Sequence, residues 1–395
     1  MPRLYGRRDA NRYANSRIVD LIEESYDARM QARAAIANGK GQFSIEAIEV
    51  GEPVANEVLV EIKASGICHT DHASLNWKRP LVMGHEGAGV VRAVGPQVRH
   101  VKPGDSVVLN WAIPCGTCYQ CRRGEAVLCE ESKPAYVMER SNAHAHPEGT
   151  TWQGQPVDRS FNIGTLSSLT LVRAPAVTPL PDNVPFTAAC IVGCGVMTGF
   201  GSAVNVAKIT TGSSVAVIGC GGVGLNIIQG ARLNGAEIII AIDMHESRIA
   251  QAKRFGATHG LLADKKDSDF ETLAQHVKAL TSGRGADYAF EATAAPALAF
   301  APLRLVRNAG MALQVSGIND PVTVPMPWFM WNKIYLTPLY GGCVPSRDFP
   351  RIFDHYRRGE LKLDELVTRT YPLDQLGTAF EDMLAGRNAK GVITF

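Results

Sequence analysis

The chain has 395 residues, with 40 basic and 38 acidic side chains and a formal net charge of +2. Apolar residues make up 46% of the sequence and charged residues 20%, which excludes an extensively disordered protein. The balanced charge argues against a broad nucleic-acid-binding surface, so no partner of that kind is predicted. A chain of this length is expected to form about two domains.

The N-terminal 29 residues differ from the rest of the chain. Residues 1–29 are polar and rich in arginine, and short apolar runs begin at Met30. Two interpretations stay open: a surface extension, or translation that starts at Met30. Because the N-terminus lacks the apolar core of a secretory signal, a cytoplasmic location is predicted. In that reducing compartment the nine cysteines are expected to be thiols or metal ligands.

Strand patterns dominate residues 41–195. Val58, Val60 and Ile62 alternate with polar residues, which is the period of a half-buried strand. Short runs of this kind, broken by turn residues, favour a compact barrel-like domain. The charge-free stretch 186–207 is long enough to span a membrane, but its glycine and hydroxyl residues argue against a span. No membrane association is predicted.

Strands alternate with helices from about residue 196 onward. Buried strands are predicted over 213–219 and 236–243, with a helix over 222–235 between them. The further predicted elements are helices over 246–256 and 269–283, strands over 286–293 and 310–317, tail helices over 348–359 and 373–386, and a final strand over 391–395. This alternation predicts an α/β fold with a doubly wound parallel sheet.

A glycine-rich turn follows the first of these strands. It fits the pattern G-x-G-x-x-G and consists of Gly219, Cys220, Gly221, Gly222, Val223 and Gly224. Its glycines permit a tight turn and a close approach of the backbone to a pyrophosphate at the helix N-terminus. Asp243, 19 residues beyond Gly224, is expected to bind the adenosine ribose and to repel a 2′-phosphate, so NAD is favoured over NADP. Arg248 lies either near the same ribose or on the solvated face of its helix.

One short segment carries four cysteines in the spacing C-x2-C-x2-C-x7-C. They are Cys115, Cys118, Cys121 and Cys129. Four soft thiolates so close in sequence suit a closed tetrahedral zinc site. Because four protein ligands leave no position for a substrate, a structural role is favoured over a catalytic one. An iron–sulfur cluster is the competing interpretation, but this spacing matches neither of the usual ferredoxin patterns.

Two further cysteines and a histidine are dispersed along the chain. Cys68 lies in GICHTDH, His85 in GHEGAG and Cys194 in IVGCGVMTG. Two cysteines and one histidine form the ligand set of a catalytic zinc with an open fourth position. Taken singly, each residue is more often a packed thiol or a hydrogen-bonded histidine than a metal ligand, so the order of motifs along the whole chain has to decide.

From about Met30 to Phe395 the chain resembles the zinc-containing medium-chain alcohol dehydrogenases. GICHTD, GHEGAG, the four-cysteine segment, GCGxxTGxGSAV and the glycine-rich turn follow one another in that family's order. The resemblance implies a GroES-like β-barrel catalytic domain around an inserted Rossmann dinucleotide-binding domain. The implied boundaries are 30–195 and 342–395 for the catalytic domain, about 112–130 for its structural zinc lobe, and 196–341 for the Rossmann domain.

The resemblance also implies roles for residues of the catalytic domain. Cys68, His85 and Cys194 match the ligands of the catalytic zinc, whereas Cys190 matches no ligand. The remaining matches are Glu86, an acid that can approach the metal; Asp71, a carboxylate behind the ligands; Thr70, the hydroxyl that takes the substrate proton; and Trp111, a bulky wall of the substrate pocket.

Three residues match the family's cofactor contacts. His69 and Lys390 match basic residues near the pyrophosphate, and Thr198 matches a residue that packs against the nicotinamide. The sequence departs from the family where many members have a histidine five residues after the first zinc ligand. That position is Ala73 here, and His72 stands one residue earlier. Either His72 forms the outer end of the proton relay or the proton leaves through water.

Together these features predict an oxidoreductase that transfers a hydride reversibly between a primary or secondary alcohol and NAD, with two zinc ions per chain. Its expected partner is a small alcohol or aldehyde. The long segment between Cys129 and Cys194 resembles that of the dimeric family members, which favours a homodimer, with a tetramer as the alternative. An alternative substrate is the thiol adduct of formaldehyde, with Lys133 as a candidate binding residue. A more remote alternative is a non-catalytic zinc- and nucleotide-binding protein.

Overall fold

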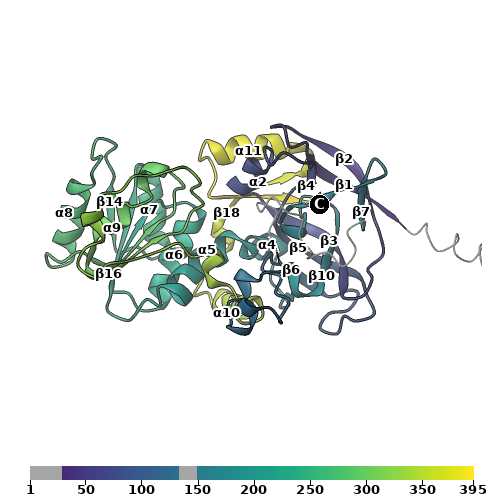
Figure 1. Cartoon of the computed structure of the whole chain (residues 1–395), viewed down its shortest axis with the longest axis horizontal. Coiled ribbons are helices and arrows are strands. Elements are labelled where there is room, and N and C mark those ends of the chain that lie inside the picture. The colour runs from purple at the N-terminus through teal and green to yellow at the C-terminus, as the bar shows by residue number, and fades with distance from the viewer. Residues whose placement is uncertain (1–28, 133–148) are drawn as a thin grey trace, which may run out of the picture.

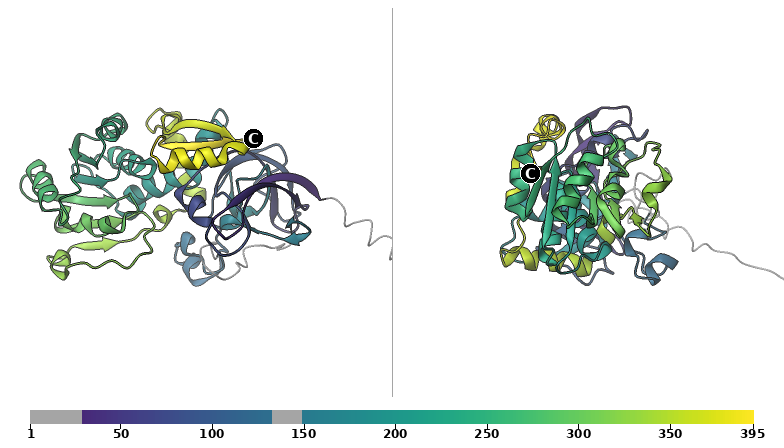
Figure 2. Two further views of the ribbon diagram at one scale, coloured as in Figure 1. Left: turned by 90° about the horizontal axis from the view of Figure 1, so that it is seen from above. Right: turned by 90° about the vertical axis from the view of Figure 1, so that its left-hand side faces the viewer.

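The computed structural model of the chain describes residues 29–132 and 149–395 (Figure 1). All but the last residue of the expected N-terminal extension, and Lys133, lie outside the described residues. Strands from the first half of the chain and from the C-terminal tail gather at one end of the long axis. A parallel sheet with its helices forms the other end, as the view from above also shows (Figure 2, left).

Two largely antiparallel sheets form the barrel-like part. One has the order β8-β7-β2-β1-β4-β9, and the other has the order β11-β6-β5-β3-β19-β18 with β10 beside β3. The strands of the first sheet are β1 (Met30–Ala37), β2 (Phe43–Val50), β4 (Leu81–Val82), β7 (Thr150–Trp152), β8 (Gln155–Pro156) and β9 (Asp158–Arg159). Those of the second are β3 (Glu57–Gly66), β5 (Glu86–Val94), β6 (Ser106–Leu109), β10 (Leu169–Arg173), β11 (Val177–Pro179), β18 (Val367–Pro372) and β19 (Lys390–Thr394). Because β19 pairs with β3, the C-terminal tail completes this part of the fold.

A six-stranded sheet of order β14-β13-β12-β15-β16-β17 forms the second part, and all of its neighbouring strands are parallel. The strands are β12 (Ser214–Ile218), β13 (Ile238–Asp243), β14 (His259–Leu262), β15 (Ala286–Glu291), β16 (Val306–Gln314) and β17 (Ile334–Leu336). The helices are α6 (Gly222–Leu233), α7 (Glu246–Phe255), α8 (Glu271–Leu280) and α9 (Ala301–Leu305). The strand order reverses between β12 and β15, which is the switch point where such sheets bind ligands. The predicted α/β class with a parallel sheet is confirmed.

One buried apolar core runs through both parts of the molecule. It joins Val60 of β3 to Val217 of β12 through the helix α5 (Gly195–Gly201). Helices α5 and α6 pack closely, because a Cβ atom on Gly199 would lie only 2.3 Å from the carbonyl oxygen of Val223. The absence of a side chain at this glycine therefore brings α5 against the helix that follows the glycine-rich turn.

The tail helices differ slightly from their predicted bounds. Helix α10 (Pro345–Arg357) begins three residues earlier than predicted, because Pro345 suits the first position of a helix. Helix α11 (Leu376–Leu384) begins three residues later, because residues 373–375 form a separate 3-10 turn. The chain passes from one part to the other between β11 and β12 and returns between β17 and β18. The domain boundaries given above stay predictions.

Among the described residues, no single helix is long and apolar enough to cross a membrane. One bent pair, Phe186–Gly193 and Gly195–Val206, passes by length and composition, with 58° between its halves.

Candidate active site

The dispersed cysteines and the histidine come together in the fold. Donor atoms of Cys68, His85, Glu86 and Cys194 all lie within 4.8 Å of one another. Cys68 caps the helix α2 (His69–Ser74) directly after β3, and His85 directly precedes β5. Cys194 caps α5 with a non-helical backbone, at φ −147° and ψ −82°. Three segments that are distant in sequence therefore meet in one cluster suited to a metal ion.

A buried carboxylate holds two members of this cluster in place. Asp71 Oδ1 lies 2.7 Å from Nδ1 of His85, and Asp71 Oδ2 accepts the backbone N–H of Cys68 at 2.9 Å. The contact at Nδ1 leaves Nε2 as the ring nitrogen available to a metal. A hydrogen bond from Cys194 lowers the pKa of the Cys68 thiol well below its ordinary value, despite burial. Cys68 thus favours the thiolate, which is the metal-binding form.

Glu86 is the fourth residue of the cluster, and it forms an ion pair with a lysine. Its Oε1 lies 2.5 Å from Nζ of Lys390, which also donates to the carbonyl of Ile67 at 3.1 Å. Burial raises the pKa of Glu86 to about 7, although Lys390 opposes the shift. Oε2 of Glu86 is buried without a hydrogen-bond partner in the part of the chain that the structure describes, which fits a nearby cation. Lys390 therefore directs its ammonium group to Glu86, while its stem passes Gly222 of the glycine-rich turn.

Thr70 and His72 both lie on α2. The hydroxyl Oγ1 of Thr70 lies 3.7 Å from Sγ of Cys68, so it borders the metal-binding cluster. The ring of His72 packs edge-on against Phe380 of α11, with 5.6 Å between the ring centroids. The structure thus brings Thr70 to the cluster and places His72 against a neighbouring helix, and a proton relay through His72 stays a prediction.

An aromatic wall borders the same cluster. The ring centroid of Phe161 lies 4.6 Å from that of His85 and 5.2 Å from that of Trp111. Trp111 in turn stacks on Tyr340, with 4.0 Å between centroids and 16° between planes. Trp111 is the predicted pocket wall, whereas the sequence analysis does not identify Phe161 or Tyr340. Neither follows a periodic pattern or a motif, so the sequence carries no signal that singles them out.

The four closely spaced cysteines form a second cluster, with all donor atoms within 4.8 Å of one another. The backbone N–H groups of Thr117 and Cys118 donate to Sγ of Cys115 at 3.4 and 3.3 Å. The N–H of Cys121 donates to Sγ of Cys118 at 3.4 Å. These backbone hydrogen bonds lower the pKa of Cys115 to about 6. A set of four thiols, with backbone donors directed at Cys115 and Cys118, fits a closed tetrahedral zinc site.

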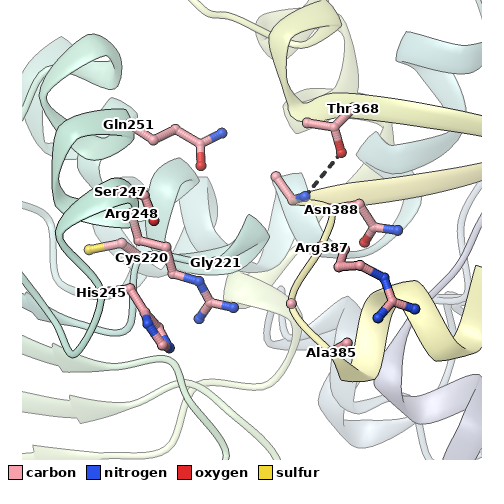
Figure 3. Close-up of a pocket in the computed structure, with 12 residues that line it drawn as sticks. Cys220, Gly221, His245, Ser247, Arg248, Gln251, Thr368, Ala385, Arg387 and Asn388 are labelled. Atoms are coloured by element: carbon pink, nitrogen blue, oxygen red, sulfur yellow. Dashed lines mark hydrogen bonds between the residues drawn. The ribbon is translucent and has the colours of Figure 1, made fainter.

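A cavity of about 310 Å³ opens beside the glycine-rich turn (Figure 3). It is lined by Cys220, Gly221, His245, Ser247, Arg248, Gln251, Thr368 and residues 385–389. Figure 3 shows side chains of α7 on one side and the loop before β19 on the other. The cavity therefore lies between the parallel sheet and the C-terminal tail, next to the predicted pyrophosphate-binding turn.

The turn itself has the geometry that its glycines predict. Gly219 has a φ of +91°, and a Cβ atom on Gly224 would lie 1.8 Å from the carbonyl oxygen of Gly219. Only glycine allows this conformation and this approach. Asp243, at the end of β13, accepts the backbone N–H of Cys220 at 2.9 Å. Arg248 lies 3.8 Å from the same carboxylate, so it stands beside the predicted ribose-binding residue.

His69 and Thr198, two further predicted cofactor contacts, do not line this cavity. Partial burial lowers the pKa of His69, and the charges of nearby Lys390 and Arg248 act in the same direction. Thr198 is partly buried on α5, and its backbone N–H donates to the carbonyl of Cys194 at 2.8 Å. Both residues are thus adjacent to the metal-binding cluster, and their contacts with a cofactor stay predictions.

Two family models match the chain. An alcohol dehydrogenase GroES-like domain matches residues 54–182, and a zinc-binding dehydrogenase domain matches residues 222–357. The S-(hydroxymethyl)glutathione dehydrogenase of Paracoccus denitrificans is 32% identical over 385 residues, covering 93% of this chain and 100% of that protein. The chain belongs to the zinc-containing medium-chain alcohol dehydrogenase family.

Further relatives of this alcohol dehydrogenase support the same family assignment. Alcohol dehydrogenase B of Mycobacterium tuberculosis is 34% identical over 370 residues, covering 89% of this chain and 95% of the relative. The crystal structure of benzyl alcohol dehydrogenase from Acinetobacter calcoaceticus has a TM-score of 0.83 and 29% identity, covering 93% of this chain and 99% of that one. The predicted GroES-like and Rossmann architecture and the predicted enzyme class, a zinc-dependent alcohol dehydrogenase, are confirmed. Membership also supports zinc and NAD(H) in general as cofactors.

Proposed function

We propose that this alcohol dehydrogenase transfers a hydride reversibly between a primary or secondary alcohol and NAD. The observation that carries the proposal is the cluster of Cys68, His85 and Cys194. Cys194 stands at the start of α5, and α5 packs on α6, the helix that begins in the glycine-rich turn. Unlike the four thiols of the lobe, Cys68, His85 and Cys194 supply only three ligands, which leaves a fourth position for the substrate oxygen.

Two zinc ions per chain fit the two donor sets. Cys68, His85 and Cys194 would hold the first, and the lobe cysteines the second. The lowered pKa of Cys68 and the available Nε2 of His85 suit such an ion. A zinc ion held at the first site would act as a Lewis acid on the alcohol oxygen. Asp71 holds the His85 ring and the Cys68 backbone together, and the buried aromatic wall excludes water from this side of the site.

Thr70 accepts the proton of the alcohol at its Oγ1 and passes it outward. We expect Thr70→Ala to lower kcat by at least about a hundredfold, because a positioned proton acceptor contributes that much or more to catalysis. Thr70→Ser keeps the hydroxyl and should retain most of the activity. Steady-state kinetics with saturating cofactor measure both variants. Wild-type kcat in Thr70→Ala would show that the proton leaves by another route.

NAD is the proposed cofactor, because the Asp243 carboxylate lies at the end of β13 beside the glycine-rich turn. A negative 2′-phosphate placed next to this carboxylate would be repelled, whereas the ribose diol of NAD can donate hydrogen bonds to it. Arg248, at 3.8 Å, only partly offsets that charge. We therefore expect kcat/KM for NAD to exceed that for NADP.

A panel of primary, secondary and aromatic alcohols, each assayed with NAD and NADP, tests the function. Reduction of the cofactor is followed by its absorbance. The proposal predicts turnover of at least one alcohol class, faster with NAD. Zinc-loaded enzyme that reduces neither cofactor with any of these alcohols would refute the proposal. Benzyl alcohol belongs in the panel because a structural relative is a benzyl alcohol dehydrogenase.

A second candidate substrate is the thiol adduct of formaldehyde. It is favoured by the relative from Paracoccus denitrificans, an S-(hydroxymethyl)glutathione dehydrogenase. The candidate residue Lys133 lies outside the described residues. NAD reduction with formaldehyde and glutathione together, compared with each alone, separates this activity from ordinary alcohol oxidation. Turnover that requires both compounds would identify the adduct as a substrate.

We further propose a homodimer that forms through the edge of the parallel sheet. Strand β17 is an edge strand, and Trp331 and Ile334 at this edge are 67% and 45% exposed. An exposed apolar edge of this kind favours pairing with a second copy. Light scattering of the purified enzyme tests this: the mass of one chain would rule out the dimer. Nine cysteines, none of them in a disulfide, fit the proposed cytoplasmic location.

A further inference from the structure

Tyr340 lies next to the proposed active site, yet none of the steps above uses it. It begins the short turn η8 (Tyr340–Gly342), where the chain returns from the parallel sheet, and it is 2% exposed. Its φ is +50°, in the left-handed region that bulky residues rarely adopt. Such a conformation persists only where the surroundings determine it strongly. The contacts of Tyr340 therefore show which parts of the structure depend on its left-handed conformation.

The hydroxyl group of Tyr340 donates to the backbone carbonyl of Gly193, a residue 147 positions away in the sequence. Gly193 directly precedes the ligand Cys194, where one helical segment ends and α5 begins. The non-helical backbone of Cys194 leaves this carbonyl without a place in a regular helix. The tyrosine hydroxyl therefore holds the peptide that leads into a candidate zinc ligand.

The ring of Tyr340 fixes a second part of the site. It stacks on Trp111, whose indole nitrogen Nε1 is buried and has no hydrogen-bond partner among the residues that the structure describes. Hydrogen bonding thus does not orient the indole ring. Stacking on Tyr340 and contact with Phe161 do so instead, and Phe161 lies against the ring of His85.

The turn that carries Tyr340 is itself anchored. A Cβ atom on Gly201 of α5 would lie 2.4 Å from the carbonyl oxygen of Gly341, so the two backbones touch. Nδ2 of Asn205 donates to the same carbonyl at 3.2 Å. The backbone of the turn is therefore fixed against α5, and the Tyr340 side chain projects from a rigid base.

We infer that Tyr340 is a positioning residue whose hydroxyl sets the peptide before Cys194 and whose ring sets the orientation of Trp111. Through these two contacts one side chain couples the chain segment that leaves the parallel sheet to a zinc ligand and to the pocket wall. The part that concerns the pocket wall rests on the proposed function, whereas the part that concerns Cys194 can be tested through zinc binding alone.

The hydroxyl is tested with Tyr340→Phe, which keeps the ring stack. Loss of the hydroxyl leaves the Gly193 carbonyl buried without a donor. This lowers the equilibrium population of the native orientation of that peptide by roughly tenfold or more. We expect one of the two zinc ions to be released about tenfold faster in excess chelator, while the other is released at the wild-type rate. Tyr335→Phe is the matched control, because the Tyr335 hydroxyl also donates to a backbone carbonyl, that of Ala299, at 2.9 Å.

The ring is tested with Tyr340→Leu. We expect the ratio of kcat/KM for benzyl alcohol to that for ethanol to change by about tenfold, mainly through KM, because a freed Trp111 reshapes the pocket. Wild-type zinc release in Tyr340→Phe would overturn the role assigned to the hydroxyl, and an unchanged ratio in Tyr340→Leu that assigned to the ring. If Tyr340→Leu does not fold, Tyr340→Met takes its place as the test of the ring, while Tyr340→Phe decides the role of the hydroxyl. Failure of the proposed function itself would appear in the wild-type enzyme, which would then lack NAD-linked alcohol oxidation.

Discussion

Cys194→Ser is expected to bind one zinc ion per chain instead of two, and to lose more than about a thousandfold in kcat/KM for alcohol oxidation. The reason is that a Lewis acid at the substrate oxygen supplies several kcal/mol of transition-state stabilisation. Cys194 completes a set of donor atoms that lie within 4.8 Å of one another. A serine hydroxyl is a poor substitute for a thiolate in such a set. Metal analysis and steady-state kinetics on the same preparation measure both effects.

Cys190→Ser provides a matched control four residues away. Cys190 is fully buried, and its thiol donates to the carbonyl of Thr187 at 3.3 Å, a bond that a serine can also make. Burial raises the pKa of this thiol well above its ordinary value, so it is an inert core residue. We expect this variant to keep two zinc ions and to retain its activity. Two zinc ions and wild-type turnover in Cys194→Ser would contradict the assignment of the catalytic ligands.

Cys118→Ser is expected to lose the other zinc ion and to lower the midpoint of thermal unfolding by more than about 5 °C, because a structural zinc site contributes folding free energy directly. The lobe contacts the rest of the molecule through Val127, which packs against the main core, and through η1 (Ala126–Leu128), which touches the turn η8. Loss of zinc from the lobe is therefore expected to disturb Tyr340 as well, and activity should fall together with stability. Calorimetry and metal analysis measure the two changes.

Tyr119→Phe serves as the control for the lobe. Tyr119 follows Cys118 directly and is 63% exposed, so loss of its hydroxyl leaves the cluster of thiols intact. We expect two zinc ions and an unfolding midpoint close to that of the wild type. An unchanged midpoint in Cys118→Ser, after loss of one zinc ion, would show that the lobe contributes nothing to stability.

The parts of the site that depend on local spacing were predictable from the sequence. The four lobe cysteines lie within one short loop, so their spacing alone specifies a compact donor set. The glycine-rich turn follows a buried strand directly, and Gly219 adopts the left-handed conformation that such a turn requires. The dispersed set of Cys68, His85 and Cys194 was recognisable only through the order of motifs along the whole chain.

The parts that depend on long-range packing were not predictable. Tyr340 meets Gly193 and Trp111 only after the chain has crossed the parallel sheet and returned. Lys390, whose contact with a pyrophosphate stays a prediction, pairs with the buried Glu86, because a buried carboxylate requires a partner. No periodicity or spacing encodes such pairings.

Hydride transfer is proposed to occur at the cluster of Cys68, His85 and Cys194, and a deuterium-labelled alcohol makes it possible to follow this step itself. Zinc-loaded enzyme is incubated with NAD and with benzyl alcohol that carries deuterium on its carbinol carbon, and the reduced cofactor is analysed by mass spectrometry. We predict that the deuterium appears in the reduced cofactor, one atom for each aldehyde formed, and that Cys194→Ser abolishes the transfer. Aldehyde formed without deuterium in the cofactor, or undiminished transfer by Cys194→Ser, would contradict it.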